Sequence, residues 1–291
     1  VLATNKTASL FDQLDAADGL KSDVLVAEVF PKADPVKLDV TVEIDPAMGN
    51  AFQEAAAHIK FVFSAEDNEL PPPPLERDNH DSYIAGYPDG TVAPGRPITR
   101  AEVAAIFYRI LRDDGREEIW TTKCSYSDVP AQSWYTSQVA TLTNGGILAG
   151  YKDGTFRPQQ YITRAEFATI AARFFDVTYN GKDLFPDISG HWAEKYIERA
   201  AELGWIKGFE DGTFRPDTYI TRAQAMTMIN RVLNRIPEDE SDLLPGMNVW
   251  PDCNPGDWFY LAVQEATNSH DFEHKAGNYE TWTKLMKNPD W

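Results

Sequence analysis

Three arginines stand out as residues that could bind a charged ligand, because each occupies the same place in a repeated motif. The motif reads Ile-Thr-Arg-Ala-Glu at 98–102 and at 162–166, and Ile-Thr-Arg-Ala-Gln at 220–224. A threonine followed three residues later by Glu or Gln is a capping box, in which both side chains satisfy free amides at a helix start. We therefore expect helices to begin at Arg100, Arg164 and Arg222.

Helix capping explains the threonine and the Glu or Gln of this motif, but it does not explain the arginine. A cation in the first turn faces the positive end of the helix dipole, which costs about 0.3–1 kcal/mol. A guanidinium beside free helix-N-terminal amides does, however, make a site for an anion. Two interpretations stay open: recognition of an external carboxylate or other anion, and an internal ion pair with a nearby aspartate.

A second repeated pair joins an acid to a tryptophan five or six residues later. The pairs are Asp128 with Trp134, Asp187 with Trp192, and Asp252 with Trp258. An aromatic face beside a carboxylate can stack on a sugar ring and hydrogen-bond its hydroxyls, but large aromatics more often fill a core. For the aspartates, helix capping and ligand contact are both open.

Two features flank each arginine motif and would hold it in place. A Gly-aromatic-x-Asp-Gly-Thr sequence precedes it, at 86–91, 150–155 and 208–213. Asp-Gly favours a tight turn, and the spacing lacks the alternating acids of a calcium loop. Apolar residues at spacings of three and four follow the motif, which predicts three helices that bury one face each against one another.

The acid–tryptophan pairs lie in three head segments, residues 126–147, 185–206 and 250–266, each predicted to form a helix. A glycine is expected to end the helix in the first two. The first arginine motif has no head segment before it, whereas the C-terminus supplies one with no motif after it. We expect the last head segment to complete the first unit and close a ring, with residues 250–267 touching 86–111. The predicted units within 76–291 are 75–121, 122–180, 181–240 and 241–291.

Residues 1–70 differ from the rest and are predicted to be β-rich, as the end of a β-sandwich would be. Apolar and polar residues alternate over 38–44, as in a half-buried strand. The sequence over 45–66 resembles the C-terminal part of camelysin/TasA-like matrix-fibre domains. Four consecutive prolines then predict a stiff linker over 71–75.

The composition excludes several classes of partner. Lys and Arg number 27 against 45 Asp and Glu, and the net charge of −18 is spread along the chain, which argues against nucleic acid or an anionic membrane. No apolar run approaches the roughly 20 residues that span a bilayer. Nothing matches a nucleophile elbow, a phosphate loop or a catalytic triad, so we expect neither an enzyme nor a cofactor.

The cysteines and one histidine pair carry weaker signals. Cys124 and Cys253 fit no metal motif; free thiols are favoured over a long-range disulfide. His270 and His274 could seat a metal if they shared a helix face, but no third ligand accompanies them. We therefore expect both imidazoles to be solvated, and no metal site.

The combined motif strongly resembles the S-layer homology (SLH) module, in three copies over 75–267. The resemblance rests on Gly150-Tyr151-x-Asp153-Gly154-Thr155-Phe156-Arg157-Pro158, then 162–166, preceded by Asp128 and Trp134-Tyr135. It implies a mainly α fold in which three prongs surround a central three-helix bundle with pseudo-threefold symmetry. It also implies a bacterial cell-surface protein that attaches non-covalently to secondary cell wall polysaccharide, commonly a pyruvylated and therefore anionic glycan.

In that family the ligand lies in grooves between modules. The resemblance implies that the motif arginines meet the pyruvate ketal and that the head aspartates meet hydroxyls. The implied contacts are Arg100, Arg164, Arg222, Asp128, Asp187 and Asp252, and stacking would add Trp134, Trp192 and Trp258.

Two departures weaken parts of the pattern. Repeat one has Val92-Ala93 where the others have Phe-Arg, and Gln224 replaces the motif glutamate, removing a charge expected to position Arg222. Arg164 is therefore the favoured contact. The alternative function is a subunit of an extracellular matrix filament or surface array, whose repeats mediate assembly and whose N-terminal β segment pairs with like subunits.

Overall fold

The three predicted capping boxes are all present in the computed structural model, which describes residues 72–175 and 184–291. Thr99, Thr163 and Thr221 accept hydrogen bonds from the amides three residues on, and the Glu or Gln there accepts one in return. These boxes start the three motif helices α1 (Arg100–Arg109), α4 (Arg164–Ala172) and α6 (Arg222–Leu233).

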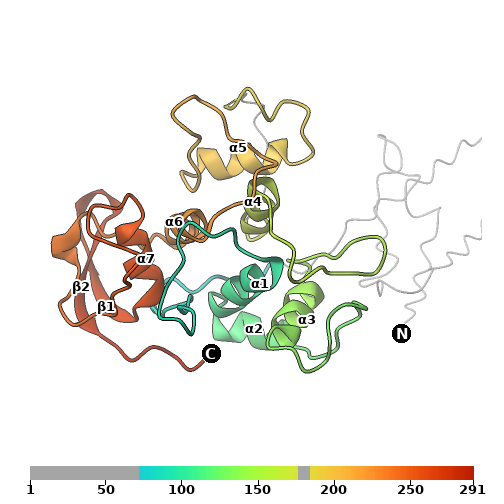
Figure 1. Ribbon diagram of the computed structural model, residues 1–291, viewed down its shortest axis with the longest axis horizontal. Coiled ribbons are helices and arrows are strands. Elements are labelled where there is room, and N and C mark those ends of the chain that lie inside the picture. Colours follow the sequence, from blue (N-terminus) through green and yellow to red (C-terminus); the bar gives the residue numbers. More distant parts are fainter. Residues whose placement is uncertain (1–71, 176–183) are drawn as a thin grey trace, which may run out of the picture. The chain divides into compact units, whose positions relative to one another are not determined.

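Each head segment forms the predicted helix, and each helix packs on the motif helix before it in the chain. The head helices are α3 (Thr136–Asn144), α5 (Glu194–Glu202) and α7 (Tyr260–Thr267). Figure 1 shows α3 beside α1, α5 beside α4, and α7 beside α6. Gly145 caps α3, and Gly204 after α5 has the positive φ of 75° that favours glycine.

The segments that lead into the motif helices are joined by a closed cycle of backbone hydrogen bonds. The Ile98 amide donates to the Ile220 carbonyl, Ile220 to Ile162, and Ile162 back to Ile98, each at 3.1 Å. The backbone amides of the first helical residues form a second cycle that runs in the opposite sense: Arg100 donates to the Gln160 carbonyl, Arg164 to Thr218 and Arg222 to Arg96, each at 2.9 Å. Each motif helix therefore begins against the loop of another unit.

The C-terminal head segment contacts the first motif region. Both Asp252 carboxylate oxygens accept backbone amides there, from Val92 at 3.0 Å and Ala93 at 2.7 Å. The Ala266 carbonyl also accepts the amides of Tyr83 and Ile84 at 3.1 Å. These hydrogen bonds join the C-terminal head segment to the residues that precede α1. The division of the chain into closed units stays a prediction.

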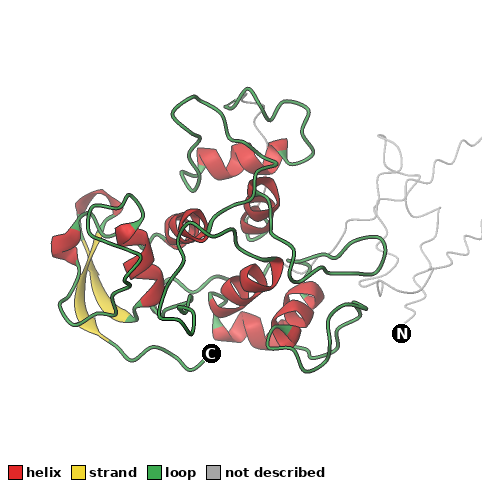
Figure 2. Ribbon diagram, in the orientation of Figure 1, coloured by secondary structure: helices red, strands yellow, loops and turns green. Residues whose placement is uncertain are grey.

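Several elements lie outside the predicted pattern (Figure 2). They are helix α2 (Asp113–Ile119), the 3-10 turns η3 (Glu240–Asp242) and η4 (Ala276–Asn278), and the antiparallel strands β1 (His270–His274) and β2 (Glu280–Leu285). The predominance of helices confirms a mainly α module. The predicted β segment over 1–70 lies outside the described residues.

The prediction for His270 is wrong. The segment is a strand rather than a helix, so His270 and His274 share no helix face, and His270 is buried at 2% exposure instead of solvated. None of the helices within 72–175 and 184–291 is both long and apolar enough to cross a membrane.

Candidate functional site

The three motif arginines turn inward. Their exposed fractions are 7% for Arg100, 6% for Arg164 and 4% for Arg222. Each Nε donates to a backbone carbonyl of the facing loop at 2.8–2.9 Å, and each guanidinium lies over at least one aromatic ring. Cation–π contact and a carbonyl acceptor stabilise a buried cation that the helix dipole alone would repel.

Two of these guanidinium groups form internal ion pairs. Arg100 Nη1 lies 3.7 Å from Glu166, and Arg222 Nη1 lies 3.6 Å from Glu102. The acids are the capping-box glutamates of another unit, whereas the sequence suggested a head aspartate as the internal partner. In both arginines Nη2 also donates to a backbone carbonyl, so these guanidinium groups are held within the fold.

Arg164 differs because the corresponding capping-box residue is Gln224. Among the residues that the structure describes, no carboxylate forms an ion pair with Arg164, and its one side-chain hydrogen bond runs from Nε to the Phe214 carbonyl. We expected the replacement of glutamate by Gln224 to leave Arg222 without an acidic partner. That expectation is wrong, because Arg222 forms its ion pair with Glu102. Burial lowers the pKa of Arg164 from 12.5 to about 10, which leaves the group cationic at neutral pH.

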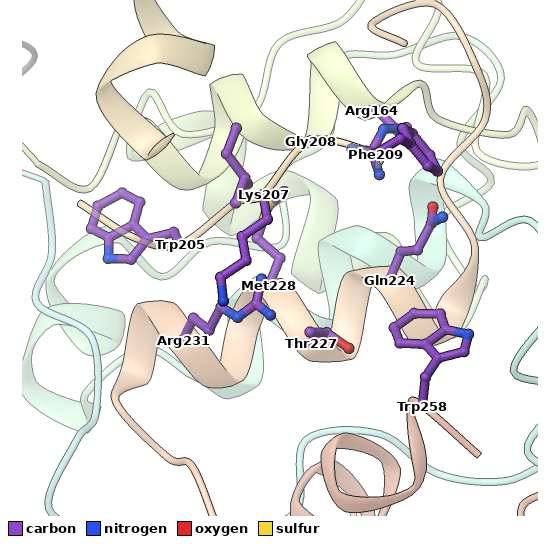
Figure 3. Close-up of a pocket in the computed structure, with 11 residues that line it drawn as sticks. Arg164, Trp205, Lys207, Gly208, Phe209, Gln224, Thr227, Met228, Arg231 and Trp258 are labelled. Carbon is purple, nitrogen blue, oxygen red and sulfur yellow. The ribbon is translucent and has the colours of Figure 1, made fainter. Parts of the chain in front are cut away.

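Arg164 and Gln224 line a pocket of about 220 Å³ (Figure 3). Lys207 and Arg231 add two further cations to its wall, and Trp258 adds an indole. Among the described residues, none of those that line the pocket is acidic. The remaining wall is formed by Trp205, Ile206, Gly208, Phe209, Thr227 and Met228. A protein with net charge −18 therefore holds a concave site whose charged groups are all positive.

The three head aspartates hold loops in place. Asp128 accepts the amides of Phe156 and Arg157, both at 2.7 Å, as Asp252 does for the first unit. Asp187 does the same for the amides of Phe214 and Arg215, at 2.9 and 2.6 Å. Both oxygens of each carboxylate accept a backbone amide of a loop, whereas helix capping was one of the two roles left open for these residues. The other, contact with a ligand, stays a prediction.

The head tryptophans are exposed, and the interpretation of these rings as core is wrong. Trp134, Trp192 and Trp258 keep 57%, 59% and 67% of their surface in contact with solvent. Trp258 is the one that lines the described pocket. It comes from the C-terminal head segment, whereas Arg164 and Gln224 come from α4 and α6, so three separate parts of the chain meet there.

Sequence reasoning missed Lys207, Arg231 and Trp205 as members of this site. Lys207 and Arg231 belong to none of the repeated motifs, and nothing in the sequence around them indicates a binding role. One feature of the sequence could have indicated this site. Two capping boxes contain a glutamate and the third contains Gln224, which predicts that one of the three arginines lacks an acidic partner within the protein. The structure also leaves Cys124 and Cys253 as free thiols, as expected.

Comparison with known proteins agrees with the repeat pattern. The model of the S-layer homology domain matches residues 81–104, 125–168 and 184–226. Cell surface glycoprotein 1 of Acetivibrio thermocellus is 36% identical over 208 residues, which cover 66% of this chain and 9% of that protein. The cellulosome-anchoring protein of the same organism is 36% identical over 213 residues, or 71% of this chain and 46% of its own length.

A third relative, the surface-layer 125 kDa protein of Lysinibacillus sphaericus, is 31% identical over 160 residues, covering 53% of this chain and 13% of that protein. The chain thus spans less than half the length of these relatives. Three separate matches to one domain, each containing one arginine motif, identify the chain as an S-layer homology domain protein with three repeats.

Proposed function

We propose that this chain anchors a cell-surface protein non-covalently to the cell envelope by binding an anionic wall polysaccharide. The observation that carries the proposal is the pocket beside Arg164, which has three cations, an exposed indole and no acid in its wall. A pyruvate ketal on a sugar combines a carboxylate for the guanidinium with a ring face for the indole.

The relatives support the anchoring part of this proposal. One is named a cellulosome-anchoring protein and others are named cell-surface or surface-layer proteins, and the shared region is the repeats. A location at the cell surface, in association with the cell wall, follows from the repeats and these relatives. Exoglucanase XynX also matches, over 14% of its own length, and we assign the repeats themselves a non-catalytic role.

The residues predicted to contact the glycan differ in how well their positions suit binding. Arg164 and Trp258 are the principal contacts, because both line the pocket. Arg100 and Arg222 remain predictions, and their ion pairs with Glu166 and Glu102 count against an equal share in binding. Asp128, Asp187 and Asp252 would act through the loops whose amides they hold, and Trp134 and Trp192 remain candidate stacking groups.

The arrangement of the units is also part of the proposal. We take the closed cycle through Ile98, Ile162 and Ile220 as support for pseudo-threefold symmetry around a central bundle of α1, α4 and α6. Grooves between neighbouring units then have equivalent positions. Only the groove beside Arg164 combines a motif arginine that lacks an acidic partner with the described pocket.

Binding to purified wall sacculi, before and after removal of pyruvate, tests the function. We expect wild-type protein to sediment with untreated sacculi and to lose most of its binding when pyruvate is removed. Arg164→Ala should weaken binding by about 1.5–3 kcal/mol, the range for a hydrogen bond to a charged group. Binding that ignores both changes would rule out anionic glycan recognition at this pocket.

A second candidate is a structural subunit of a surface array or matrix filament. The surface-layer relatives favour it, because their names refer to such layers. It predicts concentration-dependent assembly that is independent of glycan. Light scattering of the purified chain with and without wall polysaccharide separates the two candidates.

A further inference from the structure

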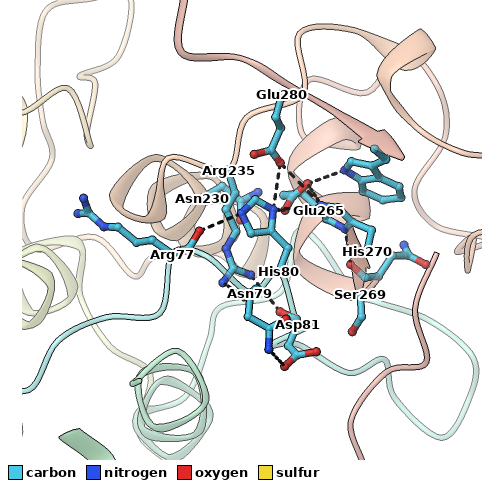
Figure 4. Close-up of polar contacts among 12 residues, drawn as sticks. Arg77, Asn79, His80, Asp81, Asn230, Arg235, Glu265, Ser269, His270 and Glu280 are labelled. Atoms are coloured by element: carbon cyan, nitrogen blue, oxygen red, sulfur yellow. Dashed lines mark hydrogen bonds and ion pairs between the residues drawn. The ribbon is translucent and has the colours of Figure 1, made fainter. Parts of the chain in front are cut away.

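Four ionisable side chains meet in the interior of the C-terminal part of the module (Figure 4). They come from four separate segments: His80 precedes α1, Glu265 lies on α7, His270 on β1 and Glu280 on β2. Their exposed fractions are 3%, 0%, 2% and 0%. Ionisable groups are rarely buried together unless they are paired or coordinate a metal.

Their ligand atoms are separated by the distances that neighbouring ligands of one small ion have. His80 Nδ1 lies 3.2 Å from His270 Nε2 and 3.4 Å from Glu280 Oε1. His270 Nε2 lies 3.3 Å from Glu265 Oε2. Tetrahedral zinc with bonds of 2.0–2.1 Å places its ligand atoms about 3.3 Å apart. Two further contacts, from His80 Nδ1 to Glu265 Oε1 and from His270 Nε2 to Glu280 Oε1, measure 3.6 and 3.8 Å, and the four candidate ligand atoms, one from each residue, all lie within 4.8 Å of one another.

The two imidazoles are oriented as metal ligands are. His80 Nε2 lies 3.2 Å from the Arg77 carbonyl, and His270 Nδ1 lies 2.9 Å from the Asn268 carbonyl. A carbonyl can only accept, so each of these nitrogens carries the proton and donates. In the neutral rings, Nδ1 of His80 and Nε2 of His270 then present lone pairs towards one another and towards the carboxylates. A backbone carbonyl on the far nitrogen is the common outer contact of a metal-binding histidine.

Ring stacking and one indole fix these orientations further. His80 stacks on Phe272 with centroids 3.6 Å apart, and His270 stacks on Trp282 at 4.0 Å. Trp282 Nε1 donates to Glu265 Oε2 at 2.9 Å, which aims the other carboxylate oxygen at His80. The groups that face the centre are therefore held before any ion arrives.

The carboxylates lack the partners that buried charges need. Among the described residues, Glu265 Oε1 and both oxygens of Glu280 have no hydrogen-bond partner. The buried Arg235 lies nearby, and its Nη atoms donate to the backbone carbonyls of Glu76, Asn79 and Asp81. With both acids ionised, as carboxylate ligands of a metal are, two carboxylates and one guanidinium would leave a formal charge of −1, which a divalent cation would offset.

We propose that His80 Nδ1, His270 Nε2, Glu265 and Glu280 form a structural site for a divalent transition metal of the Zn²⁺ class. Two imidazole nitrogens and two carboxylate oxygens, all within 4.8 Å of one another, suit zinc better than Ca²⁺ or Mg²⁺, which prefer six or more oxygen ligands. The ion would tie the segment that enters α1 to α7 and to both strands. It would therefore fasten the C-terminal head segment to the start of the first unit.

The site lies in the interior, so the test loads the metal during folding. The full chain is unfolded in guanidinium chloride with a chelator, exchanged into metal-free denaturant, and refolded with Zn²⁺, with Co²⁺ or without metal. We expect one tightly bound zinc per chain by elemental analysis after desalting. With Co²⁺ we expect the intense visible absorption of a tetrahedral cobalt centre, and with either metal a higher Tm than without.

Matched variants locate the ion. E280Q and H270Q should lose the bound zinc and the cobalt absorption, whereas H274Q, at an exposed histidine of the same strand, should keep both. If H270Q fails to refold, the cobalt spectrum of the wild-type chain and the metal content of the near-isosteric E280Q still test the proposal. A wild-type chain that retains no metal and gains no stability overturns the proposal, as does metal retention by folded E280Q and H270Q equal to that of wild type.

Discussion

Arg164 and Gln224 line one pocket at the position where the other two units hold an arginine against a glutamate. The two ion pairs run from Arg100 to Glu166 and from Arg222 to Glu102, so each joins two units. The third junction has an amide in place of the acid. A buried guanidinium without an internal anion is the best placed of the three to bind an external one.

Restoring the missing acid should close the site to anions. In Gln224→Glu the new carboxylate would pair with Arg164, as Glu166 does with Arg100. We expect the affinity for pyruvylated glycan to fall at least tenfold, equivalent to about 1.4 kcal/mol. Stability should stay within about 1 kcal/mol of wild type, because the desolvation cost of a largely buried pair offsets most of its Coulombic attraction.

Titration calorimetry and thermal denaturation measure the two effects of Gln224→Glu. Gln159→Glu adds the same charge at an exposed position outside the pocket and should leave the affinity unchanged. Equal affinities for Gln224→Glu and wild type would show that Arg164 does not meet the anionic group.

The loop-holding aspartates should matter for stability. Asp252→Asn keeps the shape but turns one acceptor into a donor, leaving one of the Val92 and Ala93 amides without its partner. We expect a loss of about 1–3 kcal/mol in the free energy of unfolding, measured by urea denaturation. Asp128→Asn and Asp187→Asn should show similar losses, because these carboxylates accept the equivalent amides.

The matched control for Asp252→Asn is Asp290→Asn, at an exposed acid near the C-terminus. Its stability should stay within about 0.5 kcal/mol of wild type. If Asp252→Asn were as stable as Asp290→Asn while the other two variants lost stability, the C-terminal head segment would not be completing the first unit.

Replacement of Trp258 should weaken glycan binding while leaving the stability of the fold almost unchanged. Its ring is 67% exposed, so Trp258→Ala should change stability by no more than about 0.5 kcal/mol. Loss of an aromatic contact of about 0.5–1.5 kcal/mol should weaken glycan binding roughly 2- to 12-fold. Trp120→Ala, at a ring 55% exposed outside the pocket, should bind like wild type; a Trp258→Ala chain that binds equally well would exclude stacking by this indole.

The pH dependence of binding should be flat across the physiological range. Burial disfavours the charged guanidinium and lowers the pKa of Arg164 to about 10. The cationic form persists below that pKa, and anion affinity should be lost only as pH rises through it. Binding measured from pH 6 to 8.5 should therefore be constant in protein that circular dichroism shows to be folded. A severalfold change in that window would point to a histidine or carboxylate as the contact.

Local sequence rules predicted the helix starts and the loop turns well. A capping box depends on residues within one helical turn, and Thr99, Thr163 and Thr221 all form one. The Asp89 side chain likewise accepts from the Thr91 amide and hydroxyl, as turn chemistry requires. These features need no information from distant parts of the chain.

Contacts between units could not be predicted in the same way. The acid that pairs with Arg222 is 120 positions earlier in the chain, and nothing local indicates that Gln224 faces Arg164 instead. The exposed Trp258 also carries no local sign that distinguishes it from a core aromatic. The burial of His270 could not be predicted for the same reason. Its partners His80 and Glu280 come from distant segments that share no motif with it, and the sequence alone therefore favoured a surface position.

The most direct test of the central claim is a titration of matched wall-glycan fragments, with and without the pyruvate ketal, into wild type, Arg164→Ala and Arg100→Ala. Removal of the ketal should cost wild type and Arg100→Ala at least tenfold in affinity. Arg164→Ala should bind both fragments equally weakly, because the group that distinguishes them is gone. If folded Arg164→Ala distinguished the two fragments as strongly as wild type does, Arg164 would not be the residue that recognises the anion.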